Sequence, residues 1–106
     1  MTTVVRFDKT GGPGVLSVQE VTVGKPKRGE ARVRHTAIGL NYIDTYHRSG
    51  LYPLPLPSGV GLEGAGVVEA VGTGVTNVKP GDRVAYAGGP PGAYAQERNM
   101  PAAKLV

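Results

Sequence analysis

The sequence predicts a mainly β domain whose short strands close into a barrel or pack as a sandwich. Valines alternate with polar residues in several short runs, and turns rich in glycine and proline separate these runs. Only one segment carries helix signals, so the crossover helices that a parallel α/β sheet requires are missing. With 106 residues, the chain can build one domain around a single modest core.

The first third of the chain predicts a β-hairpin and a third strand. A β-branched run over Thr3–Phe7 is followed by a turn at Lys9–Gly14, and a second alternating run covers Val15–Val23. After a loop at Gly24–Gly29, polar and apolar residues alternate again over Ala31–Ile38. We therefore expect three strands before residue 40.

One short helix is predicted over Tyr42–Ser49. Asn41 is a favourable N-cap residue, Asp44 places a negative charge in the first turn, and Gly50 is a favourable terminator. The next segment, Leu51–Pro57, has prolines at alternate positions, which indicates an extended connector rather than a helix or an interior strand.

The second half of the chain predicts three more strands. They cover Gly61–Val71, Arg83–Ala87 and Ala93–Arg98, with a tight turn at the sequence PGD and a loop at Gly88–Gly92. Small residues alternate with apolar ones in the first of these strands. Its glycines indicate a close approach of another backbone, or a strand that bends as a barrel wall does.

Composition limits the chemistry and the partners. The chain has no cysteine, which excludes disulfides, a thiolate nucleophile and cysteine-ligated metals. No signal sequence is visible, and no apolar run approaches the ~20 residues that span a bilayer, so we expect a cytoplasmic protein without a membrane partner. The net charge of +4 comes with one basic cluster, and the tyrosines lie mostly away from it, which disfavours nucleic acid as a partner: Lys25, Lys27, Arg28, Arg32, Arg34.

Three segments carry a family resemblance. They read GLNYIDTYHRSGLYP from Gly39, PSGVGLEGAGVVEAVG from Pro57 and PGDRV from Pro80. In this order and spacing they resemble the N-terminal catalytic domain of the medium-chain dehydrogenase/reductase superfamily, and within it the bacterial NADPH-dependent quinone oxidoreductases related to zeta-crystallin. The resemblance covers essentially the whole chain and implies a partly open, GroES-like β-barrel with one short helix.

The resemblance also indicates metal-free chemistry. In the zinc branch of the superfamily, the positions of Asn41 and Leu62 hold a cysteine and a histidine ligand, and the position of Ile43 carries the hydroxyl of a proton relay. An amide and an isobutyl side chain are poor zinc ligands. We therefore expect no zinc and no other metal site. Glu63, which is retained, is expected to make a structural hydrogen bond or ion pair.

No glycine-rich turn at the start of a helix is available to bind a pyrophosphate. In the family, a Rossmann domain C-terminal to the matched region does this. We therefore expect residues 1–106 to be the truncated substrate-side domain of a two-domain enzyme, a homodimer in its complete form. Because one wall of a cleft cannot position both reactants, the isolated chain should be inactive.

Tyr46, Tyr52 and Asn41 are the predicted catalytic residues. A tyrosine hydroxyl is a neutral donor at pH 7 and can stabilise a quinone oxygen on which negative charge develops. The alternatives are a tyrosine that packs with its hydroxyl in water and an asparagine that only caps the helix. The resemblance further implies that NADPH is contacted by one continuous segment: Asn41, Tyr42, Ile43, Asp44, Thr45, Tyr46.

Other titratable residues are predicted to be structural. Asp44 and Arg48 are four residues apart, so an ion pair on one helix face is expected. His35 and His47 have no acidic or thiol companion at ligand spacing. Two other classes of function stay open, a non-catalytic GroES-like binding or assembly module and a small nucleic-acid-binding barrel. The sequence does not distinguish which quinone or enone would be the substrate, or NADPH from NADH.

Overall fold

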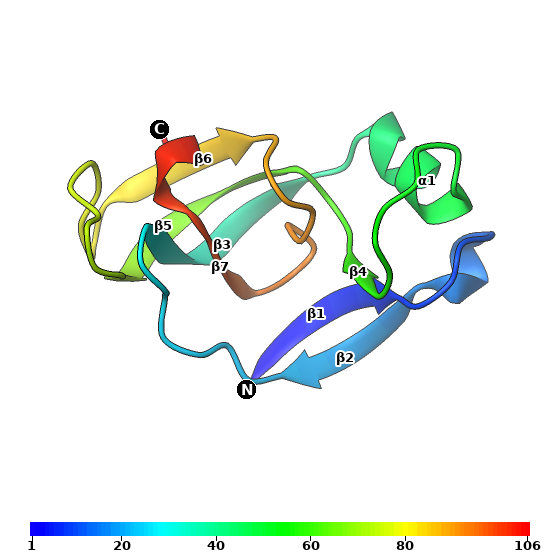
Figure 1. The fold of residues 1–106 in the computed structure, drawn as a ribbon, viewed down its shortest axis with the longest axis horizontal. Coiled ribbons are helices and arrows are strands. Elements are labelled where there is room, and N and C mark those ends of the chain that lie inside the picture. Colours follow the sequence, from blue (N-terminus) through cyan, green and yellow to red (C-terminus); the bar gives the residue numbers. More distant parts are fainter.

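The computed structural model describes residues 1–106 and contains two antiparallel sheets and one α-helix (Figure 1). The mainly β fold is thereby confirmed. The smaller sheet has the order β2-β1-β4, from strands Ser17–Val21, Thr2–Phe7 and Ser58–Gly59. The larger sheet has the order β6-β5-β3-β7, from strands Arg83–Ala87, Glu63–Val71, Glu30–Gly39 and Glu97–Pro101.

The predicted N-terminal hairpin is confirmed. β1 pairs antiparallel with β2 from Thr2 opposite Val21 to Arg6 opposite Ser17. Where the predicted turn meets the predicted second strand, Pro13–Val15 form a short 3₁₀ helix, η1, because proline at its first position favours a helical turn there. The second strand therefore begins at Ser17 rather than at Val15. The two-residue strand β4, which the sequence did not indicate, pairs with the end of β1.

The glycines of β5 allow it to lie close to β3. A Cβ atom on Gly66 would overlap the carbonyl oxygen of Arg34 on the neighbouring strand. The register between β3 and β5 shifts between His35 and Ala37, beside this contact. The predicted close backbone approach is therefore confirmed, and it coincides with an irregularity that bends the sheet.

The last strand begins four residues later than predicted. The sequence favoured Ala93–Arg98, whereas β7 covers Glu97–Pro101. The preceding residues cross from one sheet to the other: Ala95 bridges to Val4 on β1, and the Tyr94 carbonyl accepts the N–H of Val5 at 2.9 Å. This pairing uses the backbone of residues 94 and 95 before the chain joins β3.

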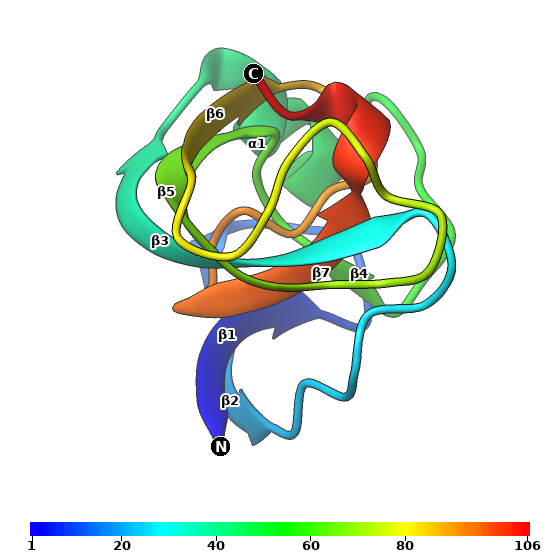
Figure 2. The ribbon, with the colours of Figure 1, turned by 90° about the vertical axis from the view of Figure 1, so that its left-hand side faces the viewer.

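The main core lies inside the four-stranded sheet. Its buried members include Val33, Val68, Val84 and Met100, and the 3₁₀ helix η2 (Ala102–Lys104) closes one side of it (Figure 2). The helix α1 (Tyr42–Ser49) has the predicted bounds and lies at the other end of the molecule, near β4 and the start of η1 (Figure 1). No helix combines the length and the apolar character that a membrane span would need.

Candidate functional site

The two predicted catalytic tyrosines lie together at the α1 end of the molecule. Their rings pack edge to face, with centroids 5.4 Å apart and an interplanar angle of 87°. The N–H of Tyr52 also donates to the carbonyl of Tyr46 at 3.3 Å, which holds the connector against the helix. Tyr46 is 36% exposed and Tyr52 52%, and neither hydroxyl has a hydrogen-bond partner within the chain.

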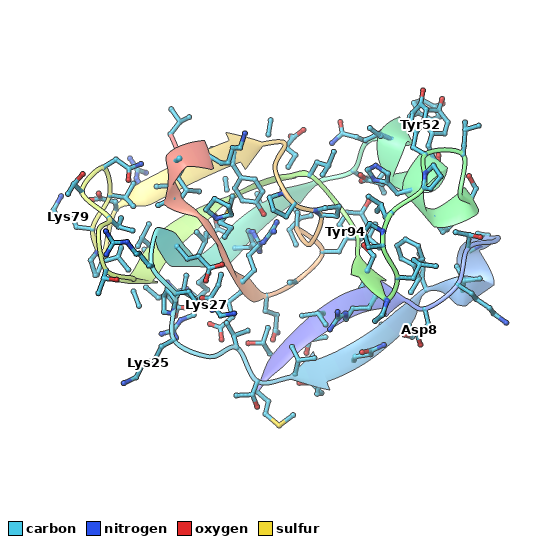
Figure 3. The ribbon with its side chains drawn as sticks, viewed as in Figure 1. Asp8, Lys25, Lys27, Tyr52, Lys79 and Tyr94 are labelled. Carbon is cyan, nitrogen blue, oxygen red and sulfur yellow. The ribbon has the colours of Figure 1, made fainter.

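The surroundings of these tyrosines differ from the basic part of the chain. Tyr52 projects from the α1 end of the molecule, whereas Lys25 and Lys27 lie toward the opposite end (Figure 3). Both lysines are exposed. Tyr52 is therefore separated in the folded chain from these two members of the basic cluster.

Asn41 links the start of α1 to the start of β5. It occupies the N-cap position in an extended conformation, with φ −127° and ψ 154°. Its side-chain nitrogen, Nδ2, donates to Oε1 of Glu63 at 3.1 Å, so the predicted structural hydrogen bond of Glu63 is confirmed. Gly39 makes this pairing possible, because a Cβ atom there would lie 2.5 Å from the Glu63 carboxyl group.

The residues predicted to contact the cofactor divide into two sets. Tyr42 is 83% exposed, Asn41 and Ile43 are partly exposed at the same N-terminal end of α1, and Tyr46 is partly exposed about one turn further along. Thr45 is half-buried, and its hydroxyl donates to the Tyr42 carbonyl at 2.6 Å. Asp44 is buried with 3% exposure, so its side chain faces the interior of the protein.

The predicted ion pair between Asp44 and Arg48 is wrong. Oδ2 of Asp44 accepts the hydroxyl of Tyr94 at 2.7 Å and the backbone N–H of Asn41 at 3.1 Å. Arg48 instead donates from Nε to the carbonyl of Gly11 at 3.2 Å. The spacing of four residues puts both side chains on neighbouring helix positions, but each has a stronger partner outside the helix.

Tyr94 is a residue of this region that the sequence did not indicate. Burial raises the pKa of its phenol, and the hydrogen bond to Asp44 raises the pKa further. The hydroxyl therefore keeps its proton and acts as the donor to the Asp44 carboxylate. Fifty residues separate the two side chains, so no local spacing could have revealed their contact.

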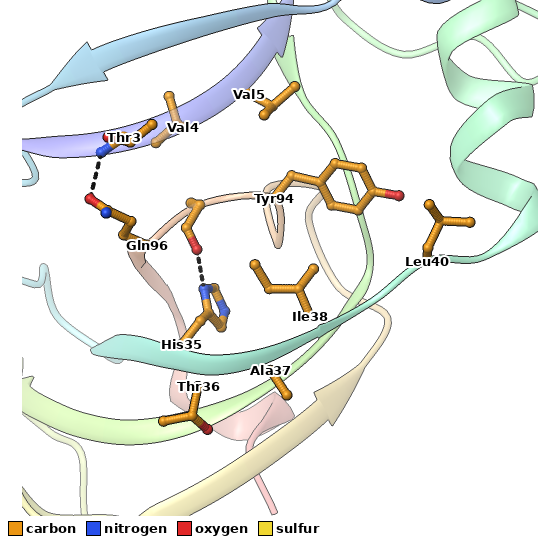
Figure 4. Close-up of a pocket in the computed structure, with 11 residues that line it drawn as sticks. Thr3, Val4, Val5, His35, Thr36, Ala37, Ile38, Leu40, Tyr94 and Gln96 are labelled. Atoms are coloured by element: carbon orange, nitrogen blue, oxygen red, sulfur yellow. Dashed lines mark hydrogen bonds between the residues drawn. The ribbon is translucent and has the colours of Figure 1, made fainter.

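An apolar groove of about 540 Å³ runs between β1 and β3 (Figure 4). Tyr94 lies between Val5 and Ile38 in this groove, and its hydroxyl points toward Leu40 and α1 (Figure 4). The ring of Tyr94 thus forms part of the groove, while its hydroxyl belongs to the helix contact. This one side chain joins the two regions.

A second hydrogen-bond network lies inside the barrel around His35. Its Nδ1 is 2.8 Å from the Ala95 carbonyl, and its Nε2 is 2.7 Å from the Tyr86 hydroxyl. Since a carbonyl only accepts, Nδ1 carries the proton of the neutral ring and Tyr86 donates to Nε2. Burial lowers the pKa of His35, and the nearby Arg98 lowers it further, against the opposing effect of the Ala95 bond.

Arg98 completes the hydrogen-bond network around His35 and connects it to the loop after β6. Its guanidinium lies 5.6 Å from the centroid of the Tyr86 ring and donates to the Pro90 carbonyl at 2.8 Å. His35 therefore has structural partners on both ring nitrogens. The other histidine, His47, is buried on α1. No group of three or more metal-ligating side chains lies close enough together to hold an ion.

Comparison with known proteins gives consistent results. Residues 27–106 match the family described as the alcohol dehydrogenase GroES-like domain. A quinone oxidoreductase of Pseudomonas aeruginosa is 57% identical over 103 residues, which are 96% of this chain and 32% of that protein.

Two solved structures are also similar to this chain. Escherichia coli quinone oxidoreductase complexed with NADPH has a TM-score of 0.95 at 51% identity, over 98% of this chain and 32% of that one. The Pseudomonas syringae quinone oxidoreductase has a TM-score of 0.96 at 55% identity, over 100% of this chain and 33% of that one. The chain thus spans about a third of the length of these relatives.

Proposed function

The chain belongs to the alcohol dehydrogenase GroES-like domain family, and from that premise we propose that it is the substrate-side domain of an NADPH-dependent quinone oxidoreductase. Relatives that share about half of its residues are named quinone oxidoreductases, and one of them was solved in complex with NADPH, although the chain spans only a third of their length. The observation that carries the proposal is the pair Tyr46 and Tyr52, whose exposed hydroxyls have no partner within the chain.

The two tyrosines would act on the oxygen atoms of the quinone. As the quinone is reduced, negative charge develops on an oxygen, and a donor already in place stabilises that charge more than water does. The edge-to-face packing of Tyr46 and Tyr52 restricts both rings, so their hydroxyls need little reorganisation when the substrate binds. Asn41, oriented by Glu63, would bind and orient the substrate beside them.

The helix N-terminus is the part of this chain that fits a nicotinamide cofactor, which would supply the hydride. Asn41, Tyr42 and Ile43 present partly or fully exposed groups there, and Tyr46 does so about one turn further along. Asp44 does not fit this role, because its carboxylate is buried and bonded to Tyr94. The proposed cofactor contacts are therefore narrower than the continuous segment that the resemblance implies.

The proposal assigns no step to zinc. The positions that hold zinc ligands in the related branch carry Asn41 and Leu62 here, and the side-chain amide of Asn41 donates to Glu63. A small-molecule quinone, a cytoplasmic location and a homodimeric complete enzyme are parts of the same proposal.

A chimera tests the proposed activity. In it, residues 1–106 replace the matching first third of Escherichia coli quinone oxidoreductase 1, which is 52% identical to this chain. We expect the chimera to oxidise NADPH with a benzoquinone at a rate at least about a hundredfold above that of the 106-residue chain, because hydride transfer needs both reactants held close together. Comparable rates for the two proteins, or an inactive folded chimera, would refute the proposal.

The alternative is a non-catalytic GroES-like module that assembles into a ring. Size-exclusion chromatography of the 106-residue chain distinguishes the two, because a ring elutes far ahead of a monomer of 11.0 kDa. Elution as a ring would favour the alternative.

A further inference from the structure

The helix that carries the proposed site has no fully buried apolar side chain. α1 has eight residues, and its buried residues are Asp44 and His47, both polar. Helices this short are unstable in water unless tertiary contacts hold them. The position of α1 therefore depends strongly on the polar contacts at its two ends.

The C-terminal end of α1 is held by the turn before η1. The N–H of Gly11 donates to the carbonyl of Arg48 at 2.9 Å, and Nε of Arg48 donates back to the carbonyl of Gly11 at 3.2 Å. Gly50 ends the helix in a left-handed conformation, with φ 90°. These contacts fix the end that lies away from Asn41.

The N-terminal end of α1 is held by Tyr94 through Asp44. The phenol donates to Oδ2 of the buried carboxylate at 2.7 Å. Oδ1 of Asp44 is buried and has no partner, and no cation pairs with the residue. Without the phenol, the carboxylate would keep only its bond from the Asn41 N–H, so the loss of this one hydroxyl should be costly.

Tyr94 is itself held in place by three neighbours. Its carbonyl accepts the N–H of Val5 on β1 at 2.9 Å, and its N–H donates to the carbonyl of Val60 at 2.8 Å. Its ring packs on Gly61, where a Cβ atom would lie 2.6 Å from Cδ1 of the ring. Gly61 has φ 98°, so a larger residue is disfavoured there for two reasons. These contacts fix the backbone and ring of Tyr94, and with them the position of its hydroxyl.

We propose that Tyr94 is a positioning residue, whose hydroxyl, acting through Asp44, fixes the N-terminus of α1 so that Asn41 and Tyr46 meet the substrate. Asp44 lies three residues after Asn41 and two before Tyr46, within the same turn and a half of helix. The role in substrate binding rests on the proposed function. The anchoring of α1 does not, so the two can be tested separately.

Four variants separate positioning from simple stability. Tyr94→Phe removes the hydroxyl and keeps the ring on Gly61. Asp44→Asn keeps an amide oxygen that can accept both hydrogen bonds, whereas Asp44→Leu removes both. Tyr86→Phe is the matched control, because it also removes a buried hydroxyl, which is bonded to His35 and Arg98 and makes no hydrogen bond to α1.

The first readout is amide hydrogen exchange in the 106-residue chain. In Tyr94→Phe and Asp44→Leu, we expect the α1 amides to exchange at least about tenfold faster than in the control, relative to core amides of β3 and β5. Asp44→Asn should stay close to wild type. Equal exchange of α1 in Tyr94→Phe and Tyr86→Phe would overturn the anchoring role, whatever the activity of the protein.

The second readout is kcat/KM for benzoquinone in the chimera, measured where each variant is folded. We expect a fall of about tenfold for Tyr94→Phe, restoration of most activity in Asp44→Asn relative to Asp44→Leu, and little change for Tyr86→Phe. An active chimera that Tyr94→Phe leaves unchanged would overturn the positioning role and leave the proposed function intact. An inactive wild-type chimera refutes the proposed function, and with it the part of the inference that concerns substrate.

Discussion

His35 is a partly buried base that the fold holds in its neutral form. The Ala95 carbonyl fixes the proton on Nδ1, and the Tyr86 hydroxyl donates to Nε2. Protonation of Nε2 would place a second donor against that hydroxyl and a positive charge near Arg98. Burial is the main cause that lowers the pKa of His35, and Arg98 adds to it.

This environment predicts a pH dependence of stability. The folded-state pKa of His35 lies below its ordinary value of 6.5. As the pH falls past that value, the unfolded chain therefore binds the proton before the folded chain does. The free energy of unfolding should therefore fall as the pH drops from about 7.5 to 5.5, and His35→Gln should lose less over the same interval. Urea unfolding of both proteins at the two pH values measures the difference.

Other groups titrate in this comparison without obscuring it. A hydrogen bond with Glu97 raises the pKa of Glu69, but both glutamates are present in both proteins, so their contribution cancels. If wild type and His35→Gln lose the same stability between the two pH values, His35 is not held as a neutral ring between the Ala95 carbonyl and the Tyr86 hydroxyl.

The partners of single residues show how far local sequence reasoning extends. Tyr46 on α1 and Tyr52 in the connector after it are six residues apart, and both were singled out from one local segment. Asp44 was matched to Arg48 by helix spacing, whereas its true partner, Tyr94, comes from a different part of the fold. A contact over fifty residues depends on how the sheets pack, which a single sequence does not encode locally.

The elements themselves were more predictable than their partners. The bounds of α1 follow from Asn41 and Gly50, which act through their own backbone conformations. β7 was displaced because the backbone of Tyr94 and Ala95 pairs with β1, a competition between two sheets that alternation cannot reveal. β4 was missed because two residues carry no periodic signal.

At the same scale, the close approach of β5 to β3 predicts that two glycines of the chain differ sharply in how well they tolerate a larger side chain. Gly66→Ala would drive a Cβ atom into the carbonyl of Arg34, and neither strand can move without breaking ladder bonds. We expect a loss of about 3 kcal/mol in the free energy of unfolding, or failure to fold. Gly24→Ala is the matched control, because nothing lies within 4 Å of its Cβ position.

Urea unfolding measures both glycine variants. The control should stay within about 0.5 kcal/mol of wild type. A Gly66→Ala protein as stable as Gly24→Ala would mean that the backbones of β3 and β5 lie too far apart at Arg34 for a Cβ atom to collide with the carbonyl.

The whole molecule places its main core and its proposed site at opposite ends. The apolar cluster lies within the larger sheet, whereas α1 lies at the other end of the molecule (Figure 1). Tyr46 and Tyr52 are exposed there. The barrel class and the GroES-like resemblance could be predicted from three segments in order. The support of α1 by Tyr94 and the pairing of Asn41 with Glu63 could not, because they depend on how the two sheets and the helix meet.

The central claim is that Tyr46 and Tyr52 supply the donors for quinone reduction. The most direct test is NADPH-dependent benzoquinone reduction by the chimera, compared with its Tyr46→Phe/Tyr52→Phe form and with Tyr86→Phe as the control. We predict that the double variant loses about a hundredfold in kcat while the control keeps most of its activity, because only the first lacks the hydroxyls that stabilise the developing charge. A double variant as active as the control would contradict the claim.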